Sequence, residues 1–372
     1  MNFNIRVITL SVVLATLAIF AASMIVVDKA LKDESSTTAA AATTAPPTTT
    51  GDMAGMAGMS GGSTLTSFAG AAPENADRLA MAHKPFPARL PGLHAGDVLP
   101  VHLVLTDRTV EVAPGVKYAA WAWAGGAPGP VIHVRQGQTV KITLTNRGAI
   151  PHSVDFHAAR VAPDKYFKDV NPGESFTFSF QANDPGVFMY HCGTKPVLMH
   201  IANGMYGAIV VEPKTPLPPA QKQYVLVASE WYLDSDGLKK PAQFDMDKAH
   251  ARMPDWMTFN GYAGQYVTHP LTANPGETVR FWIVDAGPSI ATDFHIVGTL
   301  LDRAYVDADL TQPQNALRNV QTATVPAGGG GVFDVKIDKP GLYPFVSHAF
   351  ASVDMGQVGV LDVGNVKGTM SH

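Results

Sequence analysis

Four residues around the single cysteine of the chain have the types and the spacing of a metal site. Cys192 is followed by His200 and Met205 in the run CGTKPVLMHIANGM, and His152 lies 40 residues before it. A thiolate, two imidazoles and a weakly bound thioether are the ligands of a blue-copper electron-transfer site. A lone cysteine is more often a buried apolar residue, and Met205 alone would be interpreted as core packing. The grouping of all four residues favours copper.

Strand geometry predicts a second group of ligands that faces away from the first. Successive side chains of a strand point to opposite faces, so if Cys192 points into its own sandwich, the adjacent His191 points outward. His152 and His157 are five residues apart and also face opposite ways where the segment is extended. Asp155, two residues before His157, shares the outward face of that histidine.

A further pair of histidines lies in the second half of the chain. His348 directly follows Ser347, which occupies the place of the cysteine in an internal repeat, so we expect it to point outward like His191. Three imidazoles with an open position define a catalytic rather than a structural metal site. We choose His157, His191 and His348 as ligands of a second copper at a contact between domains, with His295 left as an acid or hydrogen-bond donor beside it.

The elements that position these residues are β-strands. From Val98 onward the chain consists of short runs rich in Val, Ile, Thr and Phe, broken by Gly, Pro, Asn and Asp, which is an all-β pattern. Three segments of the first half recur in order in the second: QGQTVKITL (136–144) and PGETVRFWI (275–283), DFH (155–157 and 293–295), PGVFMYHC (185–192) and PGLYPFVS (340–347). Such a repeat predicts a duplicated Greek-key sandwich.

We therefore expect two β-sandwich domains, at residues 97–213 and 223–364. The proline-rich residues 214–222 between them are typical of a semi-rigid connector, and residues 365–372 form a tail.

The first part of the chain differs from the rest. Residues 7–27 are almost wholly apolar and long enough to span a bilayer, so residues 1–30 are predicted to be an uncleaved membrane anchor or, alternatively, a cleaved signal segment. Either alternative places the remaining chain in the periplasm or on the outer face of the cell membrane. Residues 31–96 are predicted to be a flexible linker and lead-in rich in Thr, Ala and Gly. Its methionines, which could bind Cu(I) but are more simply incidental in such a linker, are Met53, Met56 and Met59.

Charge excludes nucleic acid as a partner. Only 16% of the residues are charged, the net charge is −4, and no basic run could neutralise a row of phosphates.

Several motifs resemble those of the copper-containing nitrite reductases, which are two-domain cupredoxins of the multicopper oxidase superfamily. The motifs are PHSVDFH (151–157), YHC (190–192), HIANGM (200–205), DFHIVG (293–298) and VSH (346–348), and the similarity extends from about residue 97 to 363. The resemblance implies an all-β fold of two tandem cupredoxin-like Greek-key β-sandwich domains. The transmembrane helix and disordered linker that we expect before them lie outside the part that resembles the family.

The resemblance also implies two coppers per chain and a role for each site residue. The type 1 copper ligands would be His152, Cys192, His200 and Met205. The type 2 copper ligands would be His157, His191 and His348. Asp155 and His295 would be the catalytic pair, and Val297 would lie over the substrate pocket.

The implied reaction is the one-electron reduction of nitrite to nitric oxide and water, a step of denitrification. An external donor such as a small cupredoxin or cytochrome c would reduce the type 1 copper, and the electron would pass through Cys192 and His191 to the type 2 copper. Members of the family are homotrimers, so His348 would act across a subunit interface.

Two other classes are alternatives. A two-domain laccase-like multicopper oxidase needs more histidines, usually in His-x-His pairs, but the chain has no such pair and Gly193 follows Cys192. A non-enzymatic copper electron-transfer protein would have no use for His295 and His348. Ligand types alone do not separate nitrite from oxygen or hydroxylamine as substrate.

Overall fold

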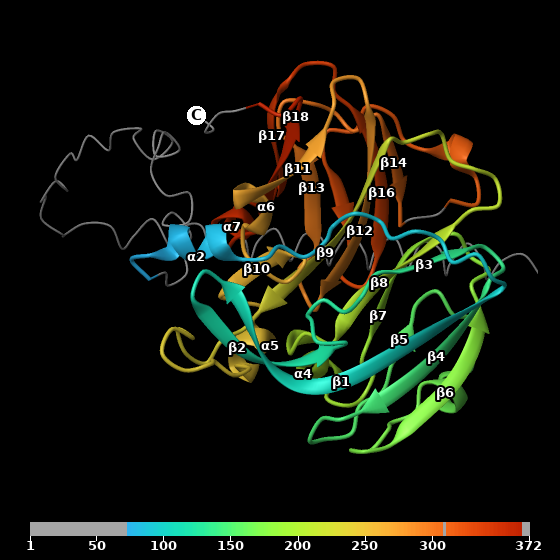
Figure 1. Ribbon diagram of the computed structural model, residues 1–372, viewed down its shortest axis with the longest axis vertical. Helices are drawn as coiled ribbons and strands as arrows, with labels where there is room; N and C mark the ends of the chain where they lie inside the picture. The colour runs from blue at the N-terminus through green and yellow to red at the C-terminus, as the bar shows by residue number, and fades with distance from the viewer. Residues whose placement is uncertain (1–72, 308–309, 367–372) are drawn as a thin grey trace, which may run out of the picture. The chain divides into compact units, whose positions relative to one another are not determined.

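The computed structural model describes residues 73–307 and 310–366 (Figure 1). The predicted anchor, the three methionines Met53, Met56 and Met59, and most of the predicted tail lie outside these residues. Within the part of the chain that is described, no helix has both the length and the apolar character that crossing a membrane requires.

Domain 1 is a sandwich of two four-stranded sheets. Its strands are β1 (Val98–Ala113), β2 (Val116–Trp123), β3 (Ile132–Arg135), β4 (Thr139–Asn146), β5 (Asp155–Phe156), β6 (Ser175–Gln181), β7 (Gly186–His191) and β8 (Tyr206–Glu212). One sheet has the order β2-β1-β4-β6 and the other β3-β8-β7-β5. Two short helices lie in the connections, α3 (Pro163–Tyr166) and α4 (Val197–Ala202).

Domain 2 is a sandwich of two five-stranded sheets. Its strands are β9 (Lys222–Trp231), β10 (Trp256–Phe259), β11 (His269–Ala273), β12 (Thr278–Gly287), β13 (Thr292–Ile296), β14 (Arg303–Val306), β15 (Ala323–Val325), β16 (Gly330–Lys336), β17 (Gly341–Ser347) and β18 (Val358–Val363). The sheet orders are β10-β9-β12-β16-β14 and β11-β18-β17-β13-β15. The helices in the connections are α5 (Met246–Ala251), α6 (Gln265–Thr268), η3 (Pro313–Asn315) and α7 (Phe350–Asp354).

The two domains share one strand arrangement. β1 pairs with β4 and β3 with β8 in parallel, and the corresponding strands β9 with β12 and β11 with β18 do the same. The segments that repeat in the sequence fall on β4 and β12, on β5 and β13, and on β7 and β17. In Figure 1 the cyan and green strands of domain 1 lie below the orange and red strands of domain 2. The prediction of a mostly β chain with two sandwich domains is confirmed.

Strand β7 borders two hydrophobic cores because its side chains alternate between two faces. Tyr190 and, just beyond the strand, Cys192 belong to the core of domain 1, against which Phe188 packs. Val187 and Met189 point the other way, into a separate core that also contains residues of domain 2. The alternation therefore assigns neighbouring positions of one strand to different cores.

The facing sheet of domain 2 divides its side chains in the same way. Val225 and Trp282 face domain 1 and share the core of Val187 and Met189. Their neighbours point into the core of domain 2, which contains Leu226, Ala228, Phe281, Ile283, Phe294 and Phe345. The sheet β3-β8-β7-β5 thus packs on the sheet β10-β9-β12-β16-β14, and each fully buried aliphatic or aromatic side chain contributes about 1.5–3 kcal/mol to that contact.

Part of the predicted linker packs on domain 2. Helix α2 (Ala76–Ala82) leads into a segment that lies beside β9. There the carbonyl of Ala88 accepts a hydrogen bond from the Val225 N–H at 2.7 Å, and the Leu90 N–H donates to the Gln223 carbonyl at 3.1 Å. Composition gives no sign of this contact, because it depends on a strand far along the chain.

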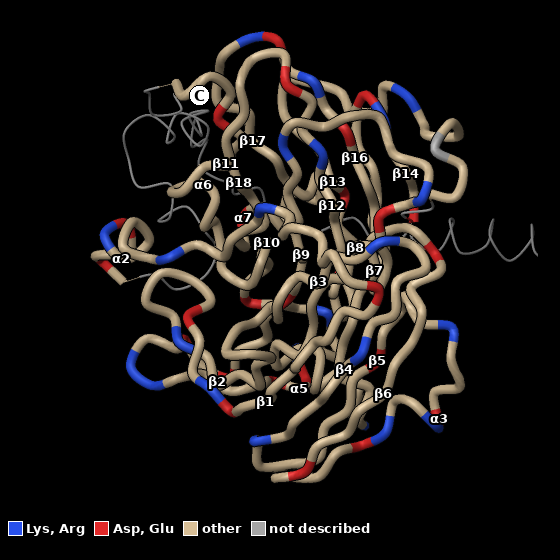
Figure 2. Tube along the Cα trace, turned by 45° about the vertical axis from the view of Figure 1, so that its right-hand side comes forward, with Lys and Arg blue, Asp and Glu red and all other residues tan. Residues whose placement is uncertain are grey.

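Acidic and basic residues are interspersed along the tube in Figure 2. One ion pair is buried: Arg280 donates to Asp334 through Nε at 2.6 Å and through Nη2 at 2.8 Å, with side chains 5% and 0% exposed. Arg280 Nη2 also donates to the Pro218 carbonyl at 2.8 Å. The pair therefore attaches the connector to β12 and β16.

We predict that Arg280→Ala lowers the free energy of unfolding by about 3–5 kcal/mol, because it leaves the Asp334 carboxylate buried without its bidentate partner. Urea denaturation of the purified variant measures this loss. The matched control is Arg160→Ala, which removes a bidentate pair with Asp184 at the surface and should leave stability nearly unchanged. Equal effects of the two substitutions would contradict the prediction.

Candidate metal centres

One group of metal-binding side chains is fully buried in domain 1. We call His152, Cys192 and His200 the cysteine group; one ligand atom from each lies within 4.8 Å of the others. The Cys192 Sγ is 3.2 Å from His200 Nδ1 and 3.9 Å from His152 Nδ1, and the two Nδ1 atoms are 3.1 Å apart. The side chains are 0%, 0% and 1% exposed. The sequence predicted these residues as ligands of one metal ion, and the structure brings them together.

Backbone contacts close the chain around the cysteine group. Cys192 directly follows the last residue of β7, and His200 lies on α4. The Cys192 N–H donates to the Met205 carbonyl at 3.1 Å, and the Met205 N–H donates to the His200 carbonyl at 3.3 Å. Met205 is 0% exposed and belongs to the same hydrophobic core as Cys192. His152, the remaining predicted ligand, is held by an antiparallel β-bridge to Val170.

Burial sets the protonation of the cysteine group. It lowers the pKa of His152 to about 3 and that of His200 to about 4. Both imidazoles are therefore neutral at neutral pH. Burial also raises the pKa of the Cys192 thiol, an effect that hydrogen bonds from Thr194 and Ser153 partly offset. Two neutral nitrogens and a sulfur that converge from three segments are a donor set that fits copper.

A second group lies at the end of the face by which domain 1 contacts domain 2. We call Asp155, His157 and His191 the aspartate group; their ligand atoms also lie within 4.8 Å of one another. Asp155 on β5 is directly opposite His191 on β7. The His191 Nε2 is 3.0 Å from His157 Nε2 and 3.9 Å from Asp155 Oδ2. His191 is 9% exposed, whereas His157 is exposed to solvent.

Carbonyl acceptors orient both imidazoles of the aspartate group. His157 Nδ1 is 2.9 Å from the carbonyl of Gly328 in domain 2, and His191 Nδ1 is 2.9 Å from the carbonyl of Cys192. Because a carbonyl only accepts, each Nδ1 carries a proton, and in the neutral form of the ring Nε2 then presents the lone pair. Burial lowers the pKa of His191, which keeps its ring neutral. Two lone pairs 3.0 Å apart beside a carboxylate fit a metal ion.

The structure places His295 and His348 together, but apart from the aspartate group. Their ring centroids are 5.1 Å apart, and the ring of Phe350 lies 4.9 Å from that of His348. His295 Nδ1 donates to the Gln321 carbonyl at 2.6 Å. His295 is on β13 and His348 directly follows β17, both at the sheet β11-β18-β17-β13-β15, which is the sheet of domain 2 that does not pack on domain 1. Val297 follows β13 on this side and is 42% exposed.

Several groups that contact the candidate ligands were not predicted from the sequence, among them the Gly328 carbonyl and the Trp121 ring. Gly328 supplies the carbonyl for His157 from a turn of the other domain. The ring of Trp121 contacts the imidazoles of His152 and His200 at interplanar angles of 67° and 57°. A glycine-rich turn and a tryptophan in a strand are common features, and no local pattern linked either of them to the histidines.

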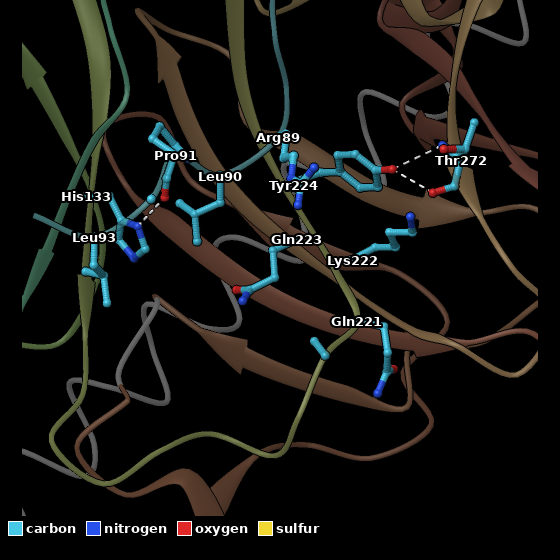
Figure 3. A pocket seen from close by; sticks show the side chains of 12 residues that line it. Arg89, Leu90, Pro91, Leu93, His133, Gln221, Lys222, Gln223, Tyr224 and Thr272 are labelled. Atoms are coloured by element: carbon cyan, nitrogen blue, oxygen red, sulfur yellow. Dashed lines mark hydrogen bonds between the residues drawn. The ribbon is translucent and has the colours of Figure 1, made fainter.

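A polar pocket elsewhere in the molecule contains none of the predicted site residues. It lies between the lead-in segment at Arg89–Leu93 and the start of β9, and its lining includes Lys222 and Tyr224 (Figure 3). The candidate metal ligands of the described residues therefore lie outside this pocket.

The fold and the two groups define the class of protein. Family models described as multicopper oxidase match residues 105–216 and 222–348. A curated copper-containing nitrite reductase from Neisseria gonorrhoeae is 40% identical over 272 residues, which cover 71% of this chain and 68% of that protein.

Solved structures agree with this relationship. The copper nitrite reductase from Nitrosomonas europaea matches with a TM-score of 0.67 and 33% identity, covering 74% of this chain and 96% of that one. A nitrite reductase from Thermus scotoductus matches with a TM-score of 0.67 and 28% identity, covering 73% of this chain and 63% of that one. The chain belongs to the copper-containing nitrite reductases and is an oxidoreductase whose metal is copper.

We predict that the metal-free protein loses stability as the pH falls from about 6.5 toward 4. The folded-state pKa values of His152 and His200 lie below the ordinary value of 6.5, so the unfolded chain binds protons first and is favoured as the pH drops. Urea denaturation of chelator-treated protein at several pH values measures the slope. Since His200→Leu removes one of the two imidazoles, its stability should fall less steeply than that of the wild type; parallel curves would show that the buried imidazoles do not cause the effect.

Proposed function

We propose that this chain reduces nitrite to nitric oxide and water with one electron and two protons. The observation that carries the proposal is the covalent link between the two groups. Cys192 of the cysteine group and His191 of the aspartate group are consecutive residues that point into different surroundings. An electron received at the buried group has a bonded path to the more exposed group, so no additional relay residue is required.

In this proposal each group holds one copper. The type 1 ligands are His152, Cys192, His200 and Met205. The type 2 ligands are His157, His191 and His348. When bound, copper supplies a site for one-electron exchange in the first set and an open position for an oxygen of nitrite in the second.

The side chains around the second set supply the protons. Breaking one N–O bond of nitrite releases that oxygen as water, which consumes two protons. Asp155 is suited to deliver them, because its carboxylate lies 3.9 Å from His191 Nε2 and its side chain is 34% exposed, so it can exchange protons with solvent. The Nδ1 of His295 donates a hydrogen bond to the Gln321 carbonyl, so its Nε2 is available to face bound nitrite.

We further propose that the enzyme is a homotrimer in which His348 of the partner subunit completes the type 2 set. A single chain carries the two halves of the set on different faces. His157 and His191 lie where domain 1 meets its own domain 2, and His348 directly follows β17 of the outward sheet of domain 2. A closed ring of identical chains allows every interface to combine one half from each neighbour. Val297 then covers the substrate pocket beside His295.

We also propose that the enzyme is exported and tethered by residues 7–27 on the outer face of the cell membrane or in the periplasm. The apolar length of that segment supports tethering. A small cupredoxin or a cytochrome c in the same compartment would supply the electrons.

We predict that purified, copper-loaded wild-type protein forms nitric oxide from nitrite in the presence of a chemical reductant, and that Asp155→Asn keeps both coppers but is slower by at least about a hundredfold, as expected for a lost proton donor. Nitric oxide release, together with copper content, measures the effect. Asp164→Asn, at an exposed position of α3, is the matched control and should react like the wild type. Normal turnover of the Asp155 variant with both metals present would refute the role of Asp155.

We predict that His348→Ala loses type 2 copper and activity while keeping the type 1 colour. Co-expression of His348→Ala chains with His157→Ala chains should restore part of the activity, because a mixed interface pairs the intact domain 1 of one variant with the intact domain 2 of the other. Copper content and nitric oxide formation of the isolated mixed oligomer test this. Mixed oligomers without activity would contradict a site shared between subunits.

A further inference from the structure

The cysteine group has no direct contact with solvent, which limits how an electron can reach it. His152 and Cys192 are 0% exposed and His200 is 1% exposed. A donor protein therefore cannot touch any of the three side chains. The electron has to cross a residue that covers them.

Trp121 is the covering residue in contact with both imidazoles. Its ring centroid lies 4.8 Å from that of His200 and 5.2 Å from that of His152. Trp121 is only partly buried, whereas Trp123, two residues further along β2, is fully buried in the core of domain 1. Trp121 therefore joins the interior imidazoles to the surface through one aromatic ring.

The main chain holds this ring in place over the group. The Trp121 N–H donates to the Asn203 carbonyl at 2.8 Å. Asn203 ends the helix α4 that carries His200, and its side chain is fixed in turn: Oδ1 accepts from the Tyr118 hydroxyl at 3.0 Å, and Nδ2 donates to the Met199 carbonyl at 2.8 Å. The tryptophan and the histidine that it covers are thus tied to the same helix end.

We propose that Trp121 is the residue through which electrons enter the cysteine group, and that the donor protein docks on its exposed edge. The inference rests on the proposed function, in which this group holds the type 1 copper. In the step, a reduced one-electron donor protein loses one electron and the cysteine group gains it. Trp121 ends the step unchanged, and no bond forms or breaks.

Two features favour Trp121 over the other residues near the site. Its aromatic ring contacts both imidazoles, whereas the neighbouring Met199 of α4, which is also partly buried, offers no aromatic ring. Tryptophan is also among the residues that most often dominate the binding energy of protein interfaces. One side chain can therefore serve both donor contact and electron coupling.

The test compares Trp121→Leu and Trp121→Phe with the wild type, and uses Met199→Leu, at the partly buried residue of α4 that precedes His200, as the matched control. The copper-loaded proteins are mixed with reduced cytochrome c and, separately, with a reduced small cupredoxin in a stopped-flow instrument, and loss of the thiolate absorption gives the reduction rate. The donor that reduces the wild type faster is used for comparison. The visible spectrum, the midpoint potential and the reduction rate with dithionite are recorded for each variant.

We expect Trp121→Leu to lower the second-order rate with the protein donor by about tenfold, the loss typical of a central aromatic interface residue. Its spectrum, potential and dithionite rate should stay near those of the wild type, Trp121→Phe should recover part of the rate, and Met199→Leu should behave like the wild type. A wild-type rate in Trp121→Leu would overturn the inference, as would an equal loss in Met199→Leu. A wild type without thiolate absorption would instead show that the type 1 assignment itself fails.

Discussion

The alternation of side chains along β7 is the constraint on which the rest of the structure depends. Tyr190 and Cys192 face the core of domain 1, and Met189 and His191 face the other way. One peptide bond therefore separates a buried thiol from an imidazole at the domain boundary. Because of this alternation, β7 packs against one hydrophobic core on each of its two faces. The packing that stabilises both cores therefore also fixes the directions of Cys192 and His191.

Duplication explains how the remaining groups are distributed. Both domains have the same strand arrangement, but Ser347 stands where the first domain has its cysteine, and the core of domain 2 is filled there by aromatic rings such as Phe294 and Phe345. Domain 2 carries His295 and His348 side by side, with their ring centroids 5.1 Å apart. His295 on β13 and His348 just after β17 lie at the sheet that does not pack on domain 1, so the proposed trimer would bring them to the aspartate group of a neighbouring copy.

Structural features that depend on the alternation of side chains along a strand, or on repeated segments, could be predicted from the sequence. The two sandwiches followed from the recurring segments, and the opposite directions of His191 and Cys192 followed from their adjacency. Contacts between distant segments left no such signal. The packing of Ala88 on β9, the carbonyl of Gly328 at His157, and the ring of Trp121 over His200 each join residues that are far apart in the chain and of common type.

If each chain holds two coppers joined through consecutive residues, anomalous diffraction at the copper edge from crystals of the copper-loaded protein should give two peaks per chain. We expect one peak among His152, Cys192 and His200, and one beside His157 and His191. A single peak at the cysteine group, with no density at the aspartate group in the assembled oligomer, would contradict it.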